Sequence, residues 1–152
     1  MRLADQSGNE FQLVILSYQH PDVHEDRWDS NWLLVSGTVA TAAGQKWSFS
    51  APCVTTFELA ELADWFDELS TDGRAPGQFD FTEPHVRFAY VPWPKRTLQL
   101  TFTGEGAPQA VSAQEREAGV TLEFPLSEAD ARELAGQIRN ALADFPPRGG
   151  AA

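Results

Sequence analysis

Cysteine, long apolar runs and a leader segment are scarce or missing in this sequence, and each shortage argues against a class of protein. Among 152 residues there is one cysteine, Cys53, so no disulfide can form within the chain. No apolar run reaches the ~18 residues that a membrane-spanning helix requires. The N-terminal "MRLADQSGNEF" becomes polar too early for a secretion signal. We therefore expect a cytoplasmic protein in which Cys53 is a small buried residue rather than a nucleophile.

Basic residues are also few. Lysine and arginine together number 11 against 22 aspartates and glutamates, which gives a formal net charge of −11. Such a field repels nucleic-acid phosphates and anionic membrane surfaces. The one short basic cluster, Lys95-Arg96, resembles a turn that leads into a strand. We expect no nucleic-acid or membrane partner, and an acidic surface that either attracts a cationic partner or keeps the protein soluble.

No sequence motif identifies a reaction. The chain has no G-x-S-x-G, no phosphate-binding glycine loop and no H-E-x-x-H. His85 precedes the alternating residues Val86 and Phe88, which indicates a surface position on a strand rather than a general base. We expect no catalytic residue and no cofactor.

The segment "HPDVHEDRWDSNW", residues 20–32, is the strongest candidate for a metal site. His20 and His24 would share a face only on a helix, and Pro21 disfavours a helix here. The neighbouring acids have neither the spaced Cys/His pattern of zinc sites nor the glycine-centred pattern of a calcium loop. We therefore predict a solvated acidic loop, anchored by tryptophans, that binds no metal.

Alternating apolar residues predict eight short strands, because only a period of two gives a strand one apolar face. Turns such as Ser7-Gly8-Asn9 predict hairpins between neighbouring strands. Val14 and Leu16 interrupt the alternation, which predicts that their strand is covered on both faces. The predicted strands occupy residues 2–5, 10–18, 32–40, 46–51, 77–82, 85–91, 96–102 and 120–124.

Apolar residues at three- and four-residue steps predict two one-sided helices, over residues 55–70 and 127–145. Thr55 and Glu58 have the spacing of a capping box, and Ser127 is a good N-cap. The residues expected to end the two helices are Gly73, Pro76, Gly77, Pro146 and Pro147.

The order of the predicted elements indicates the fold class. Four strands and a helix occur twice, with hairpin-length connections and no alternation of strand and helix. This favours a single α+β domain over residues 1–147, built as an antiparallel curved sheet or open sandwich. Residues 104–119 are expected to form a flexible excursion, and residues 148–152 a flexible tail.

Four stretches of the sequence resemble a known family: "SGNEFQLVILSYQHPD", "DSNWLLV", "FTEPHVRFAY" and "LEFPLSEADARELA". They are similar to small bacterial proteins labelled as immunity proteins to wall-associated polymorphic toxins, the WapI-like family. The resemblance spans nearly the whole chain. The matching positions are Gly8, Asn9, Tyr18, Gln19, Pro21, Asp29, Asn31, Trp32, Glu83 and Pro84.

The resemblance implies a non-enzymatic protein that occludes a cationic toxin, such as a nuclease, in a stoichiometric complex. A nuclease presents basic residues to its substrate, and complementary charge accelerates encounter. Trp28 and Trp93 join the acidic residues as candidates, since tryptophan is enriched in interaction hot spots. The candidate contacts are Glu58, Glu61, Asp64 and Glu68 on the first helix, Asp22, Glu25 and Asp26 in the loop, and the tryptophans Trp28 and Trp93.

Other interpretations remain open at this point. The acids can be merely solvated, and the tryptophans can serve the packing of the core. Residues 20–26 could belong to a metal-dependent or hydrolytic module. A homodimeric scaffold could use the threonine-rich sheet face or an unpaired edge strand, so the expected state is a monomer or a weak homodimer.

Overall fold

A computed structural model describes residues 1–71 and 77–149 of the chain. Gly73 and Pro76, which were expected to end the first helix, lie outside these residues, as do residues 150–152 of the expected tail. The predicted α+β class is confirmed, because two antiparallel four-stranded sheets and helices follow one another in the predicted order.

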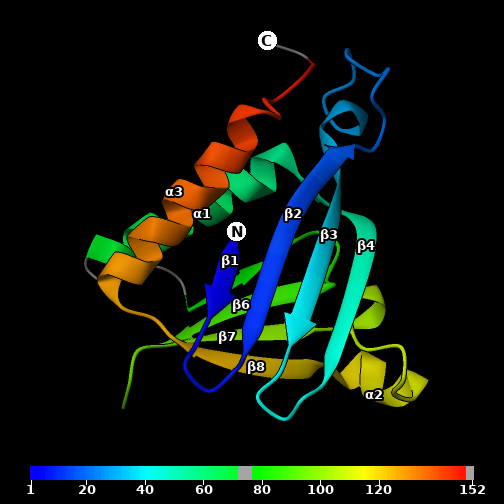
Figure 1. Ribbon diagram of the computed structural model, residues 1–152. Helices are drawn as coiled ribbons and strands as arrows, with labels where there is room; N and C mark the ends of the chain where they lie inside the picture. Colours follow the sequence, from blue (N-terminus) through cyan, green and yellow to red (C-terminus); the bar gives the residue numbers. More distant parts are fainter. Residues whose placement is uncertain (72–76, 150–152) are drawn as a thin grey trace.

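The first sheet has the order β1-β2-β3-β4 and is a simple antiparallel meander (Figure 1). Gly8 has a φ of 106°, a left-handed conformation that glycine adopts without steric cost, and this allows the turn between β1 and β2. The strands span Arg2–Ala4 (β1), Glu10–Tyr18 (β2), Trp32–Ala40 (β3) and Lys46–Thr55 (β4).

The second sheet repeats this arrangement with the order β5-β6-β7-β8. Its apolar residues alternate as predicted, so that Phe88, Leu100 and Phe124 are buried. The strands span Gln78–Asp80 (β5), Val86–Val91 (β6), Thr97–Phe102 (β7) and Val120–Pro125 (β8).

Two long helices follow the two sheets, α1 (Thr56–Thr71) after β4 and α3 (Glu128–Ala143) after β8. They lie side by side and run in opposite directions (Figure 1). The predicted capping interactions are present. Thr55 N donates to Glu58 Oε2 while Thr55 Oγ1 accepts from Glu58 N, and the Ser127 side chain accepts from Asp130 N.

The excursion between β7 and β8 is more ordered than expected. It contains a 3₁₀ turn, η2 (Gly104–Gly106), and a short helix, α2 (Ala113–Ala118), that starts with a capping box between Ser112 and Glu115. The sequence did not predict α2, because no residue of this helix is buried and the helix therefore has no apolar stripe.

The two sheets stack face to face with their strands crossing, and the two long helices pack beside them (Figure 1). Phe102 of β7 lies at the contact. Its ring packs edge-on against Phe11 and Trp47 of the first sheet, with centroids 5.2 and 5.7 Å apart, and tilted against Phe49. The open-sandwich form of the prediction is therefore the correct one.

The prediction that β2 is covered on both faces is wrong. Val14 and Leu16 are 43% and 49% exposed, although β2 lies between β1 and β3 as expected. Their side chains are on the outer face of the first sheet, whereas Phe11 and Leu13 face the core. Apolar residues on an outer face look like core residues in the sequence, because periodicity cannot say whether another layer covers them.

The division into a domain of residues 1–147 and a tail stays a prediction. Arg148, however, is not a flexible residue of the kind expected for the tail. Its backbone and side chain are both hydrogen-bonded to the loop between β2 and β3. In the residues that the structure describes, no helix combines the length and the apolar character needed to cross a membrane.

Candidate functional site

The connection between β2 and β3, residues 19–31, is an irregular but well-tied loop. As Pro21 predicts, it contains no α-helix, and its one helical element is the 3₁₀ turn η1 (Asp29–Asn31). Asp26 organises it, since its Oδ1 accepts from the backbone N–H groups of Trp28 and Asp29 at 2.7 and 2.6 Å. The carbonyl of Asp26 accepts from the Ser30 hydroxyl. Asp26 is thus the acid that satisfies the backbone groups of this loop.

Asn31 is fully buried and connects three segments of the chain. Its Nδ2 donates to the carbonyls of Arg27 and Arg148, both at 2.7 Å. Its Oδ1 accepts from Thr56 Oγ1 and Arg148 N, both at 2.8 Å. A buried amide with these partners is costly to replace, because each lost bond leaves a buried polar group unpaired.

Trp28 projects from this loop and is 62% exposed. Its ring meets Phe57 of α1 edge-on, with centroids 6.5 Å apart. The guanidinium of Arg27 lies 5.8 Å from the Trp28 ring and 5.5 Å from the Phe57 ring. These contacts hold the indole against the first turn of α1 and leave most of it open to solvent.

The acidic residues of α1 have different partners. The Glu58 carboxylate is occupied, since it accepts from Thr55 and, at 2.7 Å, from Thr82 N beyond β5. Asp64 pairs with Arg139 of α3 at 2.8 Å. Glu61 and Glu68 are exposed, and with Asp64 they form a stripe that begins near Phe57. Arg139 also pairs with Asp67, and these two carboxylates raise its pKa.

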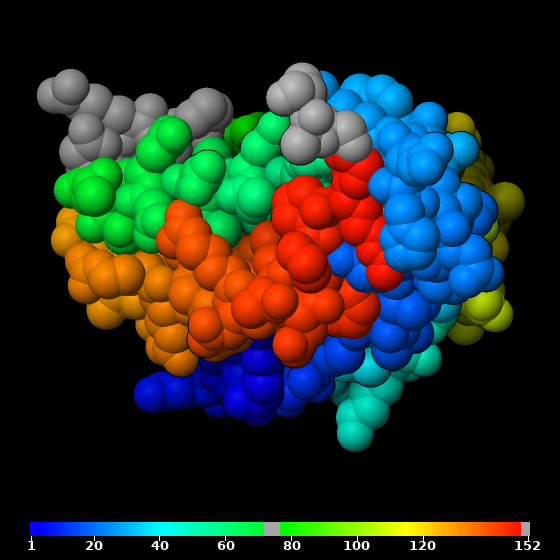
Figure 2. All heavy atoms as spheres, turned by 90° about the horizontal axis from the view of Figure 1, so that it is seen from above, coloured from blue at the N-terminus to red at the C-terminus, as the bar shows by residue number. Residues whose placement is uncertain are grey.

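The loop and α1 therefore form one surface. Figure 2 shows that residues 20–31, α1, α3 and the segment from α3 to residue 149 share one face of the molecule. The loop acids Asp22, Glu25 and Asp26 are exposed, as is Trp28. We call the combination of these four residues with Glu61, Asp64 and Glu68 the acidic face.

Trp93 does not belong to the acidic face. It is 80% exposed in the connection between β6 and β7, which lies at the opposite end of the molecule from the β2–β3 loop (Figure 1). The nine candidate contacts are thus not one site: seven form the acidic face, Glu58 has a structural role at its edge, and Trp93 lies apart.

His20 and His24 are both exposed in a segment of bends and turns, and the described part of the chain contains no group of three or more His, Cys, Asp or Glu that could hold a metal ion. The metal-dependent interpretation of residues 20–26 therefore has no geometric support.

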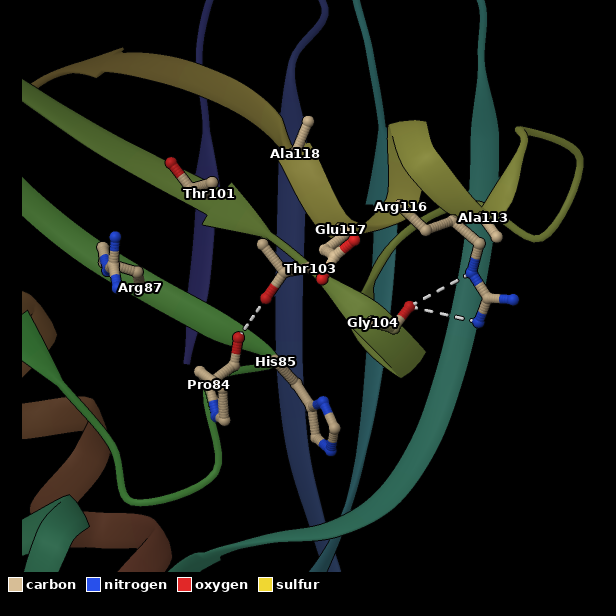
Figure 3. Close-up of a pocket in the computed structure, with 10 residues that line it drawn as sticks. All are labelled: Pro84, His85, Arg87, Thr101, Thr103, Gly104, Ala113, Arg116, Glu117 and Ala118. Atoms are coloured by element: carbon tan, nitrogen blue, oxygen red, sulfur yellow. Dashed lines mark hydrogen bonds between the residues drawn. The ribbon is translucent and has the colours of Figure 1, made fainter.

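A groove of about 610 Å³ lies between the outer face of the second sheet and α2 (Figure 3). Its two arginines are already engaged: Arg116 donates to the Gly104 carbonyl through Nε and Nη2 at 3.3 and 3.2 Å, and Arg87 pairs with Asp80 at 2.7 Å. Thr103 donates to the Pro84 carbonyl. Both arginines and Thr103 are thus used within the protein, and His85 and Glu117 are the other titratable side chains that line the groove.

Cys53 is buried, as predicted. Burial, reinforced by the negative charges of Glu58, Glu105 and Glu83, raises the pKa of its thiol to about 12. A thiol with so high a pKa stays protonated at neutral pH and is a poor nucleophile.

Sequence reasoning found the loop acids and Trp28 but missed what holds them. Phe57, the ring beneath Trp28, was not recognised, although an aromatic residue opposite the core stripe of a helix is a usable signal. Arg148 gave no signal, because nothing in the sequence relates it to a loop more than a hundred residues earlier.

The model of the immunity protein WapI-like family matches residues 2–146 of the chain. No curated protein matches it. The matched range contains every strand and helix that the structure describes, including the loop and α1.

Proposed function

Since the chain belongs to the immunity protein WapI-like family, we propose that it binds a protein toxin without catalysing a reaction and blocks the toxin by covering its active surface. The family supports a role in immunity and a toxin as partner.

The charge of the chain supports a cationic toxin. With a net charge of −11, the protein attracts basic surfaces over a long range and repels acidic ones. A nuclease is a fitting class, because its substrate-binding surface must be basic. Encounter between two such proteins is steered by complementary fields and slows as salt is added. We place this encounter in the cytoplasm, with the immunity protein acting as a monomer.

The observation that carries the proposed surface is the position of Trp28. It is a large, mostly exposed aromatic residue in a loop fixed by Asp26 and Asn31. The loop itself carries carboxylates, and α1, which Trp28 contacts through Phe57, carries others. Binding hot spots usually have a rigid aromatic residue at their centre and charged residues around it. The aromatic residue is desolvated on binding, and the charged residues select the partner.

The acidic face is therefore the proposed toxin-binding surface, with Trp28 at its centre. Glu58 supports this surface as the cap of α1 rather than as a contact. Trp93 stays a prediction for a separate contact.

The test begins with the gene directly upstream of the one for this chain, where we expect a toxin; its toxin domain is purified as a catalytically inactive variant. We expect a 1:1 complex by calorimetry whose affinity falls as sodium chloride rises from 50 to 300 mM. Replacing Glu61 and Glu68 by lysine should weaken binding at least about tenfold, mainly by slower association.

The matched control replaces Glu105 and Glu117 by lysine, since both are exposed and lie near η2 and α2, away from the acidic face. This double variant has the same net charge and should lose less than about threefold. Equal losses in the two variants would show a non-specific charge effect and refute the surface. Absence of a wild-type complex, together with no protection of cells that produce the active toxin, would refute the proposed function.

A further inference from the structure

The segment that follows α3 returns to the β2–β3 loop and lies against it (Figure 2). Three kinds of contact attach Arg148 there. Its backbone N–H and carbonyl both bond to the Asn31 amide. Its Nη1 donates to the Pro21 carbonyl at 2.9 Å. Its guanidinium lies 3.4 Å from the centre of the Tyr18 ring, which buries the stacked face.

Gly149 continues this contact along the same loop. Its φ is 70°, and a Cβ at this position would lie 2.8 Å from both the Asp26 carbonyl and the Ser30 hydroxyl. The backbone of residues 148 and 149 thus packs against the turn that carries Trp28. Because Asn31 also bonds to the Arg27 carbonyl, a direct chain of bonds runs from Arg148 through Asn31 to the residue beside Trp28.

Charge gives Arg148 a second effect. The loop carries Asp22, Glu25, Asp26 and Asp29 and only one cation of its own, Arg27. Like charges so close together favour an expanded loop. The Arg148 guanidinium, held at the base of the loop by Tyr18 and Pro21, adds a second positive charge and offsets part of this repulsion.

We propose that Arg148 is a positioning residue, which holds the β2–β3 loop closed so that Trp28 and its carboxylates are presented as one rigid surface to a basic partner. The basic partner in this inference rests on the proposed function, whereas the closed loop does not depend on it. It makes Arg148 and Gly149 a part of the structure that supports the binding surface.

The closed loop is tested without any partner. The full chain is labelled with 5-fluorotryptophan, and the Trp28 resonance is assigned by its loss in Trp28→Phe. We expect Arg148→Ala to shift or broaden the Trp28 resonance and to leave those of Trp47 and Trp65 in place. Arg148→Lys keeps the charge but not the planar stacking, so it should restore part of the wild-type spectrum.

Arg87→Ala serves as the control for the loss of one arginine, because Arg87 lies on β6, outside the loop, where it is exposed and pairs with Asp80. It should leave the Trp28 resonance unchanged. An Arg148→Ala protein that folds with an unchanged Trp28 resonance would overturn the proposal. If Arg148→Ala does not fold, Arg148→Gln, which keeps a long polar side chain but neither the charge nor the guanidinium, carries the same comparison, and an unchanged Trp28 resonance in it overturns the proposal.

The effect on binding is tested by a double-mutant cycle with the inactive toxin domain. Arg148→Ala alone should weaken the complex about tenfold, and it should have almost no further effect when Trp28 is already alanine. A merely structural role, or a direct contact of Arg148 with the toxin, would give additive losses and overturn the proposal. Failure of the wild type to bind any toxin refutes the proposed function, while the fluorine spectra still decide the role of Arg148.

Discussion

The two halves of the molecule have the same order of elements, four antiparallel strands and then a long helix. They differ in the connection between the second and third strands. Between the second and third strands, the first half has the loop of residues 19–31 and the second half has residues 92–96. Each connection carries an exposed tryptophan. Trp28 rests on Phe57 in a loop tied by Asn31, whereas Trp93 projects from a short turn and is 80% exposed.

This difference teaches that exposure alone does not define a binding residue. A side chain that is already held in place loses little conformational entropy when a partner binds, whereas a projecting side chain must be ordered at that moment. The first half thus carries a surface whose central side chain is already held in place. The second half, with its shorter strands, mainly completes the core through Phe102.

The largest expected effect concerns the contact that joins the two halves. Phe102→Ala removes a fully buried ring that packs on three aromatic residues of the first sheet, so it should lower the free energy of unfolding by about 3–5 kcal/mol. Urea denaturation measures this. Leu16→Ala, on the outer face, should change stability by less than about 1 kcal/mol. Similar losses in both variants would contradict the described core.

The two tryptophans should differ in partner binding. Trp28→Ala should weaken the toxin complex by at least about 2 kcal/mol, which corresponds to roughly thirtyfold, while Trp93→Ala should cost less than about 0.5 kcal/mol. Calorimetry with the inactive toxin domain measures both. A larger loss for Trp93 would reverse the comparison and move the binding surface to the second half.

The capping acids of the two long helices should not be equivalent. Glu58 bonds to Thr55 and also to Thr82 N in the second half, whereas Asp130 bonds to Ser127. We expect Glu58→Ala to cost about 1–2 kcal/mol of stability and Asp130→Ala about 0.5–1 kcal/mol. Thermal unfolding compares the two. An equal cost would mean that the bond to Thr82 contributes nothing.

The smallest expected effect concerns the ion pairs between the two helices. Arg139 bridges Asp64 and Asp67 at the surface, where solvent screens the attraction. Arg139→Met should therefore lower stability by about 0.5 kcal/mol, and 0.5 M salt should reduce the difference. A loss above about 1.5 kcal/mol would contradict the expectation that solvent screens these ion pairs.

Much of the fold follows from local patterns in the sequence. Alternation located all eight strands, and the capping residues Thr55 and Ser127 located the starts of the long helices. The errors arise where residue type and burial do not correspond. Val14 and Leu16 are apolar but lie outside the core, and α2 is a helix without an apolar stripe.

The candidate site was predicted only in part. The acidic character of residues 22–26 and the helical spacing of Glu61, Asp64 and Glu68 were readable in the sequence. The hydrogen bond from Thr82 N to Glu58 could not be predicted, because it joins segments from different halves. For the same reason the sequence could not show that Trp28 and Trp93 lie at opposite ends.

The sequence by itself determined the class of the fold, the starts of its long helices and its negative charge, because each depends on residue type and short-range spacing. The tertiary structure decided which acids share a face and what holds them there. Asn31, Thr56 and Arg148 meet only after the sheets and helices have packed. Hydrogen bonds between such distant segments depend on position in space, which local spacing does not encode.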